Sequence, residues 1–188
     1  MAFKRSYGHR PLFAFVGKSN VGKSSLINHL TQHQHLAKVS SMPGKTQLIN
    51  LFEAGSCVLI DLPGYGFSQV SRSLQASWDV LMGGFFEQLS SKLHLFVLID
   101  PKKPIGQEDF HMMAHCLEHQ IPFQIIFTKI DQINKTLLAT TLRPRVQELN
   151  SFLSYDPPLI LYSTAAKEGR LAVIHSIESS IAEPETTS

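Results

Sequence analysis

One short stretch near the start of the chain constrains the fold more than any other. Residues 12 to 16 are a continuous apolar run, and they lead into Gly17-Lys18-Ser19-Asn20-Val21-Gly22-Lys23-Ser24. Apolar residues at helical spacing follow over 23 to 31, so the order is strand, glycine-bounded loop, helix. In a GxxxxGK[ST] loop with these neighbours, backbone amides point inward and the helix N-terminus adds partial positive charge. The sequence therefore predicts a phosphate-binding loop, in preference to an ordinary glycine turn.

Apolar runs and helical patterns alternate along most of the remaining chain. Candidate strands lie at 12–16, 47–52, 57–62, 93–99, 123–127 and 158–162, and candidate helices at 23–31, 74–90, 107–119, 136–150 and 169–182. A short turn at Gly55 separates two of the strands, which predicts an antiparallel hairpin there. The rest reads as βαβ units. We expect a three-layer α/β fold with a mostly parallel, six-stranded sheet and one antiparallel edge strand.

The composition narrows the class of protein without identifying it. The 188 residues are 43% hydrophobic and 17% charged with a formal net charge of +2, which predicts one domain over 1 to 188 with a core at 11 to 182. Cys57 and Cys116 are too few for a disulfide framework and favour the reducing cytoplasm. A secretion signal, a membrane span and a membrane partner are not expected, because no apolar stretch approaches roughly 18 residues. The net charge of the chain is too small to indicate nucleic-acid binding by itself.

The segment Asp61-Leu62-Pro63-Gly64 closes the third predicted strand. Its carboxylate should lie beside the phosphate loop, where it suits an indirect contact to Mg²⁺, behind the direct ligands of the ion. Lys23 is placed to neutralise the β and γ oxygens of a nucleotide, and the hydroxyl of Ser24 to ligate the Mg²⁺ that bridges them. The Gly64 amide can bond a γ-phosphate and release it after hydrolysis, which would convert nucleotide state into loop state.

The segment Thr128-Lys129-Ile130-Asp131 follows another predicted strand and indicates which base is bound. The Asp131 carboxylate can accept from both N1–H and the 2-amino group of guanine, whereas adenine lacks that amino group and presents a lone pair at N1. The stem of Lys129 would cover one face of the ring, and Ser163-Thr164-Ala165 could donate an amide to O6. A phosphotransferase that uses ATP is therefore disfavoured.

These motifs resemble those of the EngB/YihA/YsxC family of ribosome-biogenesis GTP-binding proteins, which are P-loop (Ras-like) GTPases. The matching runs are GKSNVGKSSLIN, PGKTQLIN, DLPGYGF and TKID, and the resemblance covers residues 11 to 182. It implies that Pro43 to Gln47 form the first switch, with the Thr46 hydroxyl reaching Mg²⁺ in the GTP state. It also implies a monomer that binds the large ribosomal subunit or its precursor, both rRNA and protein, and that serves normal cell division and septation. Lys18 replaces the family's usual Arg, and Gln132 replaces a basic residue.

Hydrolysis should be slow without help. Many small GTPases carry a water-positioning Gln directly after DxxG, where this chain has Tyr65. Asn20 occupies the position at which related GTPases coordinate K⁺ with an Asn, although it could instead only stabilise the loop. A ribosomal activator is an equal alternative. A guanine-nucleotide-gated binding module with negligible hydrolysis is the competing class of function.

Several other features favour ordinary surface or core roles. His111, His115 and His119 have helical spacing but no carboxylate fixed to them by spacing, so a solvated or interfacial stripe is preferred over a metal site. The aromatic residues after the second switch are expected in the core, and the basic residues could contact rRNA but are scattered. They are Phe67, Trp78, Phe85 and Phe86 among the aromatics, and Lys4, Arg5, His9, Arg10, Lys102, Lys103, Arg143 and Arg145 among the basic residues.

The expected site draws on five segments of the chain. Catalytic roles fall to Lys23, Asn20, Thr46 and Gly64, and the Mg²⁺ ligands are Ser24 and Thr46. The expected ligands are GTP or GDP, Mg²⁺ and, through Asn20, K⁺. The residues expected to bind the nucleotide are Gly17, Lys18, Ser19, Asn20, Val21, Gly22, Lys23, Ser24, Gly44, Lys45, Thr46, Gln47, Leu48, Asp61, Leu62, Pro63, Gly64, Thr128, Lys129, Ile130, Asp131, Tyr162, Ser163 and Thr164.

Overall fold

The computed structural model describes residues 9–31, 38–43, 48–65, 86, 89 and 92–182. Its strands are β1 (Leu12–Gly17), β2 (Lys38–Pro43), β3 (Leu48–Ala54), β4 (Cys57–Asp61), β5 (Leu93–Ile99), β6 (Phe123–Phe127) and β7 (Leu159–Leu161). The helices are α1 (Lys23–Leu30), α3 (Gln107–Glu118), α4 (Leu138–Leu153) and α5 (Arg170–Ala182), with short 3-10 turns η3 (Ile130–Gln132) and η4 (Lys135–Leu137). Strands and helices alternate after β5, as the sequence predicts.

The strands form one sheet in the order β2-β3-β4-β1-β5-β6-β7. β1 pairs in parallel with β4 and β5, and the parallel pairing continues through β6 to β7. β3 is antiparallel to both of its neighbours, so β2 runs with the others and β3 alone, among the described strands, runs against them. A mostly parallel sheet with one antiparallel strand is therefore confirmed.

The edge of the sheet differs from the prediction. A seventh strand, β2, pairs with β3 and takes the edge position that the sequence pattern assigns to β3. The pattern misses β2 because half of its residues, in Lys-Val-Ser-Ser-Met-Pro, are polar and it lacks an apolar run. An edge strand can be held by backbone bonds to a single neighbour, so it needs less apolar sequence than a central strand. The predicted hairpin is present, with Gly55 at φ +60° in the two-residue loop between Ala54 and Cys57.

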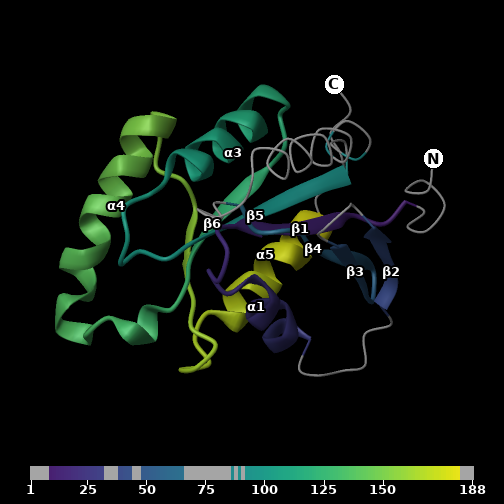
Figure 1. Ribbon diagram of the computed structural model, residues 1–188, viewed down its shortest axis with the longest axis horizontal. Helices are drawn as coiled ribbons and strands as arrows, with labels where there is room; N and C mark the ends of the chain where they lie inside the picture. The colour runs from purple at the N-terminus through teal and green to yellow at the C-terminus, as the bar shows by residue number, and fades with distance from the viewer. Residues whose placement is uncertain are drawn as a thin grey trace.

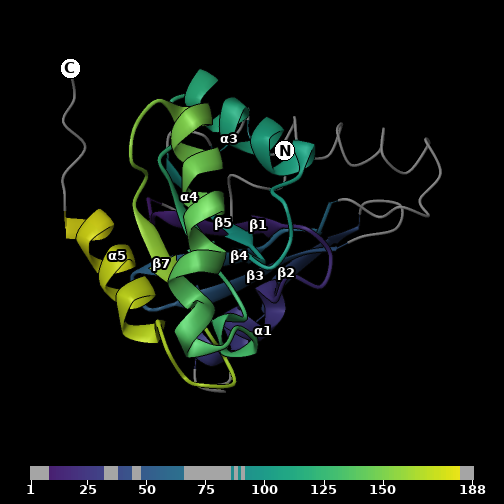
Figure 2. The ribbon, with the colours of Figure 1, turned by 90° about the vertical axis from the view of Figure 1, so that its left-hand side faces the viewer.

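Helices cover both faces of the sheet, α1 and α5 on one and α3 and α4 on the other (Figures 1 and 2). Alternate residues of β1 serve the two layers, since Phe13 and Phe15 belong to the core with α1 and α5 while Ala14 and Val16 belong to the other core. All six residues of β1 are buried. The strand that leads into the phosphate loop is thus the central strand of the molecule.

The remaining expectations for helices can be compared directly. The patterns at 23–31, 107–119, 136–150 and 169–182 correspond to α1, α3, α4 and α5. Most of the helix predicted at 74–90 lies outside the described residues, but Phe86 and Leu89 are described and both are buried. Within the described ranges, no helix combines the length and apolar character that crossing a membrane requires.

Candidate functional site

The loop between β1 and α1 has the backbone shape that an anion site needs. Gly17 has φ +148° and Gly22 has φ +113°, and a Cβ on Gly17 would lie 2.6 Å from the Leu98 carbonyl oxygen. α1 begins directly after Gly22 with no side-chain cap and no acidic residue in its first turn. Its first amides and the positive end of its dipole are therefore available to a phosphate.

The Lys23 amine is enclosed by this loop. Only 8% of Lys23 is exposed, and its Nζ donates to the carbonyl oxygens of Gly17 and Lys18 at 3.0 and 3.2 Å. Burial lowers the pKa of this amine, and the nearby Asp61 carboxylate partly opposes the shift. A buried ammonium held mainly by neutral carbonyls is stabilised by an incoming anion, so the loop is prepared for phosphate oxygens.

Two oxygen-bearing side chains of the kind that bind Mg²⁺ lie beside Lys23. The Ser24 hydroxyl donates to Asp61 Oδ2 at 2.7 Å, which joins the start of α1 to the end of β4. Burial raises the pKa of Asp61, while the Ser24 hydrogen bond and Lys23 lower it. A cation beside this carboxylate would favour its ionised form, and hydroxyl and carboxylate oxygens are ligands that suit Mg²⁺. The pair fits the predicted metal position, with Ser24 as ligand and Asp61 behind it.

The DxxG segment lies directly against the phosphate loop. The Ser19 amide donates to the Tyr65 carbonyl at 3.0 Å, and the Tyr65 amide donates to the Gly17 carbonyl at 3.4 Å. A Cβ on Gly64 would lie 2.9 Å from Lys23 Nζ and 3.0 Å from the Ser19 backbone. Gly64 therefore permits a close approach of two backbones that a larger residue would prevent. The two residues before it, Leu62 and Pro63, are buried.

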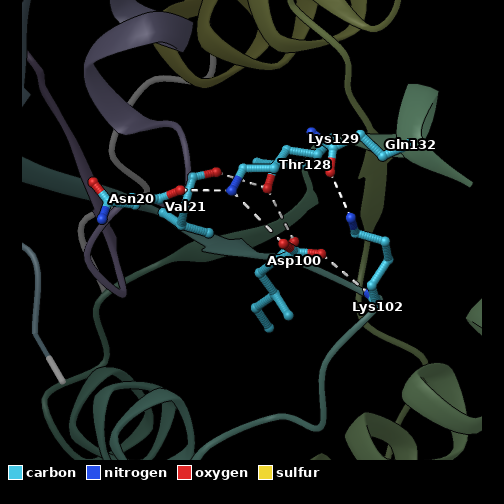
Figure 3. Close-up of polar contacts among 8 residues, drawn as sticks. Asn20, Val21, Asp100, Lys102, Thr128, Lys129 and Gln132 are labelled. Carbon is cyan, nitrogen blue, oxygen red and sulfur yellow. Dashed lines mark hydrogen bonds and ion pairs between the residues drawn. The ribbon is translucent and has the colours of Figure 1, made fainter. Parts of the chain in front are cut away.

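The segment after β6 is fastened to the same loop (Figure 3). The Thr128 hydroxyl donates to the Val21 carbonyl at 2.9 Å, and Lys129 Nζ donates to the Asn20 carbonyl at 2.6 Å. Lys129 has φ +56°, an uncommon value for a side chain of its size. The predicted base-binding segment and the predicted phosphate loop are therefore one connected structure.

The end of β7 completes this side of the site. Ser163 is fully buried, its hydroxyl donates to Asp131 Oδ1 at 2.5 Å, and it accepts from the Ala166 amide at 2.9 Å. Tyr162 lies behind it, with its hydroxyl 2.7 Å from Nδ1 of His29 on α1. Ser163 thus orients the carboxylate that is expected to recognise the base. Ile130 is buried and Thr164 is exposed.

Tyr65, which occupies the position of a water-positioning Gln, is turned toward α3. The residue is 6% exposed, and its hydroxyl donates to Asp109 Oδ1 at 2.7 Å. Burial, together with Asp109, keeps the pKa of the phenol well above its usual range. The phenol therefore remains a donor, and the geometry agrees with the expectation that Tyr65 does not orient water.

We expect Tyr65→Phe to destabilise the protein by about 1–3 kcal/mol, because the buried Asp109 carboxylate loses its hydroxyl partner. The Gly106 amide, 3.0 Å from Asp109 Oδ2, remains. Thermal unfolding measures the change, at about 2–4 °C per kcal/mol for a chain of this size. Tyr155→Phe, at an exposed tyrosine, is the matched control. Equal melting temperatures for Tyr65→Phe and wild type would contradict this interpretation of the contact.

Some predicted residues lie outside the described ranges. The first-switch residues Gly44, Lys45, Thr46 and Gln47 fall there, and of Leu48 only the backbone is described. The candidates Lys4, Arg5, Phe67, Trp78 and Phe85 also fall there, so their roles stay predictions.

The basic candidates for rRNA contact do not form one free patch. Arg10 pairs with Glu53 at 2.7 Å, and Arg145 is bonded to Glu148. His9, Lys103 and Arg143 are exposed. Scattered surface charge remains the better description of the basic residues that the structure describes.

The histidine stripe at the end of α3 does include a carboxylate at helical spacing, contrary to the expectation, because Glu118 lies three residues after His115. Ligand atoms of His115, Glu118 and His119 all lie within 4.8 Å of one another. Glu118 and His119 are exposed, and the buried Nε2 of His115 has no hydrogen-bond partner among the described residues. Metal ligands are normally oriented by such partners, so this cluster has the character of a solvated stripe.

Two carboxylates of the site region are absent from the sequence-based predictions. Asp100 lies 3.7 Å from the Lys129 amine, and Asp109 accepts from Tyr65. Asp100 directly follows a predicted strand, at the same sheet edge as Thr128, and that position is the available signal. Asp109 lies in a helix whose only visible pattern is amphipathic, so its partner could not be inferred.

The fold and the site define the class as a P-loop GTPase. A family model described as "50S ribosome-binding GTPase" matches residues 12–129. The chain is 40% identical over 169 residues to the "Probable GTP-binding protein EngB" of Christiangramia forsetii, covering 89% of this chain and 85% of that one. The chain belongs to the EngB family of P-loop GTP-binding proteins.

Other relatives and structures agree with this assignment. The protein of the same name from Flavobacterium johnsoniae is 47% identical over 126 residues, which is 66% of this chain and 60% of the relative. The crystal structure of a "probable GTP-binding protein engB" has a TM-score of 0.66 at 22% identity and covers 92% of this chain and 99% of that one. A variant of Aquifex aeolicus Era bound to GDP.AlF4- has a TM-score of 0.66 at 21% identity, covering 93% of this chain and 58% of that one. These two likenesses show the shared fold.

Proposed function

We propose that the protein binds guanine nucleotide with Mg²⁺, hydrolyses GTP to GDP, and uses the γ-phosphate to set the conformation of its switch segments. The observation that carries the proposal is the convergence of three strand ends on one loop. Lys23 is enclosed by that loop, Asp61 reaches it through Ser24, and Thr128 donates to it. Phosphate, metal and base positions would thereby share a single site.

Each group has a defined part in phosphoryl transfer. Lys23 would neutralise charge on the β and γ oxygens, and the amides at the start of α1 would bind the phosphates. Ser24 would hold Mg²⁺, which would supply positive charge to offset the charge on the phosphate oxygens. Gly64 lies close to Lys23, so its amide could donate a hydrogen bond to the γ-phosphate that Lys23 binds. Loss of that phosphate would release the DxxG segment.

The intrinsic rate should be low, because Tyr65 is bonded to Asp109 and no amide side chain stands directly after Gly64. A rate near 10⁻⁴ s⁻¹ corresponds to a barrier of about 23 kcal/mol, and each tenfold acceleration requires about 1.4 kcal/mol. An activator or a cation would have to supply the difference.

We infer that the biological partner is the large ribosomal subunit or its precursor, with a role in its assembly and in normal cell division and septation. The matched family model is named for 50S binding, and a monomer in the cytoplasm suits such a partner. The test measures GTP turnover with and without purified 50S particles, together with their co-sedimentation under a non-hydrolysable GTP analogue. Stimulated turnover and nucleotide-dependent binding are expected. Nucleotide-dependent binding with no hydrolysis in either condition would favour the gated binding module instead.

Potassium dependence is a separate prediction. Asn20 has φ +62° and is exposed at the loop, and related GTPases place a K⁺-coordinating Asn at this position. We expect faster GTP turnover in KCl than in NaCl at equal ionic strength, and loss of that difference in Asn20→Ala. Steady-state phosphate release measures both. Asn28→Ala, at an exposed asparagine on α1, is the control. Equal rates in the two salts would remove K⁺ from the mechanism.

A further inference from the structure

The loop that follows β5 holds both ends of the segment expected to bind the base (Figure 3). Asp100 Oδ2 lies 3.7 Å from Lys129 Nζ, near the start of that segment. Lys102 Nζ donates to Gln132 Oε1 at 2.5 Å, one residue after Asp131. Residues 129 to 132 are therefore bounded by two contacts to a single neighbouring loop.

Asp100 is itself fixed in place. It directly follows β5, whose last residue, Ile99, is in parallel register with Phe127 of β6. Its side chain is 12% exposed, and its Oδ1 accepts from the Lys102 amide at 3.2 Å. The carboxylate thus has a defined direction before any ligand binds.

A fixed partner for the Lys129 amine lowers the entropy that this side chain loses when a ligand binds. A free lysine side chain samples many rotamers, and fixing it loses conformational entropy at the moment of binding. Here the amine is held from two sides, by the Asn20 carbonyl at 2.6 Å and by the Asp100 carboxylate. With the amine anchored, the aliphatic stem keeps one direction across the site.

We propose that Asp100 is a positioning residue for Lys129, holding its stem where it covers a face of the purine ring. This inference rests on the proposed binding of guanine nucleotide. Asp100 contributes affinity for the base by preorganisation, because the ordering of Lys129 is already complete in the free protein. It reads no edge of the base, so it should serve guanine and hypoxanthine equally. Discrimination by the 2-amino group stays with Asp131.

The test compares binding of GDP and IDP in excess Mg²⁺ by titration calorimetry, since IDP lacks only the 2-amino group. We expect Asp100→Ala to weaken both nucleotides about tenfold while leaving the GDP/IDP ratio unchanged. Asp100→Asn keeps an acceptor for the Lys102 amide but removes the charge. It should therefore also weaken both nucleotides, with less effect on folding than Asp100→Ala. Asp156→Asn, at an exposed aspartate, is the matched control.

A double-mutant cycle decides whether Asp100 acts through Lys129. If it does, Asp100→Ala/Lys129→Ala should bind GDP about as weakly as Lys129→Ala alone, because the first change has nothing left to disturb. Independent losses that multiply, wild-type affinity in Asp100→Asn, or a collapse of the GDP/IDP ratio would each overturn the inference. A wild-type chain that binds no GDP would overturn the proposed function together with it.

Discussion

Asp131→Asn should reverse the base preference of the protein from guanine to xanthine nucleotides. The wild-type carboxylate accepts from N1–H and from the 2-amino group of guanine, whereas an asparagine amide turns one acceptor into a donor. Xanthine carries a carbonyl where guanine carries that amino group, so the amide matches xanthine. Mismatched buried polar groups discriminate by roughly 10⁴-fold, and we expect a change of that order in the GTP/XTP affinity ratio.

Direct titration of wild type and variant with GDP and, separately, with XDP measures this change. Asp156→Asn has the same chemical change at an exposed aspartate and should keep the wild-type preference. Ser163 donates to Asp131 Oδ1 at 2.5 Å in the wild type, and an asparagine can still accept there with its oxygen. The variant should therefore keep its orientation and its fold. An unchanged base preference would show that Asp131 does not contact the base.

The parts of the site that belong to a motif or close a predicted strand were predictable, because the order of strand, loop and helix determines where they lie. The order of strand, glycine loop and helix determines where Lys23 and Ser24 lie, and an Asp at the end of a neighbouring parallel strand must reach the same edge. The Ser24–Asp61 hydrogen bond at 2.7 Å shows that the two residues meet at that edge. The mostly parallel sheet followed from the same alternation of elements.

The parts that could not be predicted depend on register between distant segments. Ser163 was expected to offer a backbone amide, but its side chain orients Asp131 across 32 residues, a contact created by the parallel pairing of β6 and β7. Asp100 belongs to no motif, and it comes to lie beside Lys129 only through the parallel pairing of β5 and β6. β2 has too little apolar sequence to be recognised before its pairing with β3 is known. Local pattern determines the elements, and tertiary register determines these contacts.

Lys23→Met should lower GTP turnover by about 10²–10³-fold, because it removes a preorganised charge from the position of the β and γ oxygens. Methionine keeps an unbranched apolar stem, so the packing of the 8%-exposed side chain changes little. The carbonyl oxygens of Gly17 and Lys18 also lose a donor, and the Gly17 contact is buried. The loss of charge must therefore be distinguished from the loss of these two hydrogen bonds.

Nucleotide length separates this loss from a general disturbance of the site. Lys23 should contribute to GTP and GDP, which carry a β-phosphate, and little to GMP, which does not. We expect Lys23→Met to weaken GDP strongly while leaving GMP binding near the wild-type value, measured by calorimetry alongside single-turnover hydrolysis. Lys135→Met, at an exposed lysine outside the site, should match wild type. Equal losses for GDP and GMP would instead mean that Lys23 supports the shape of the loop. Asp131→Asn should weaken GMP and GDP alike, so the two variants together separate the base end of the site from its phosphate end.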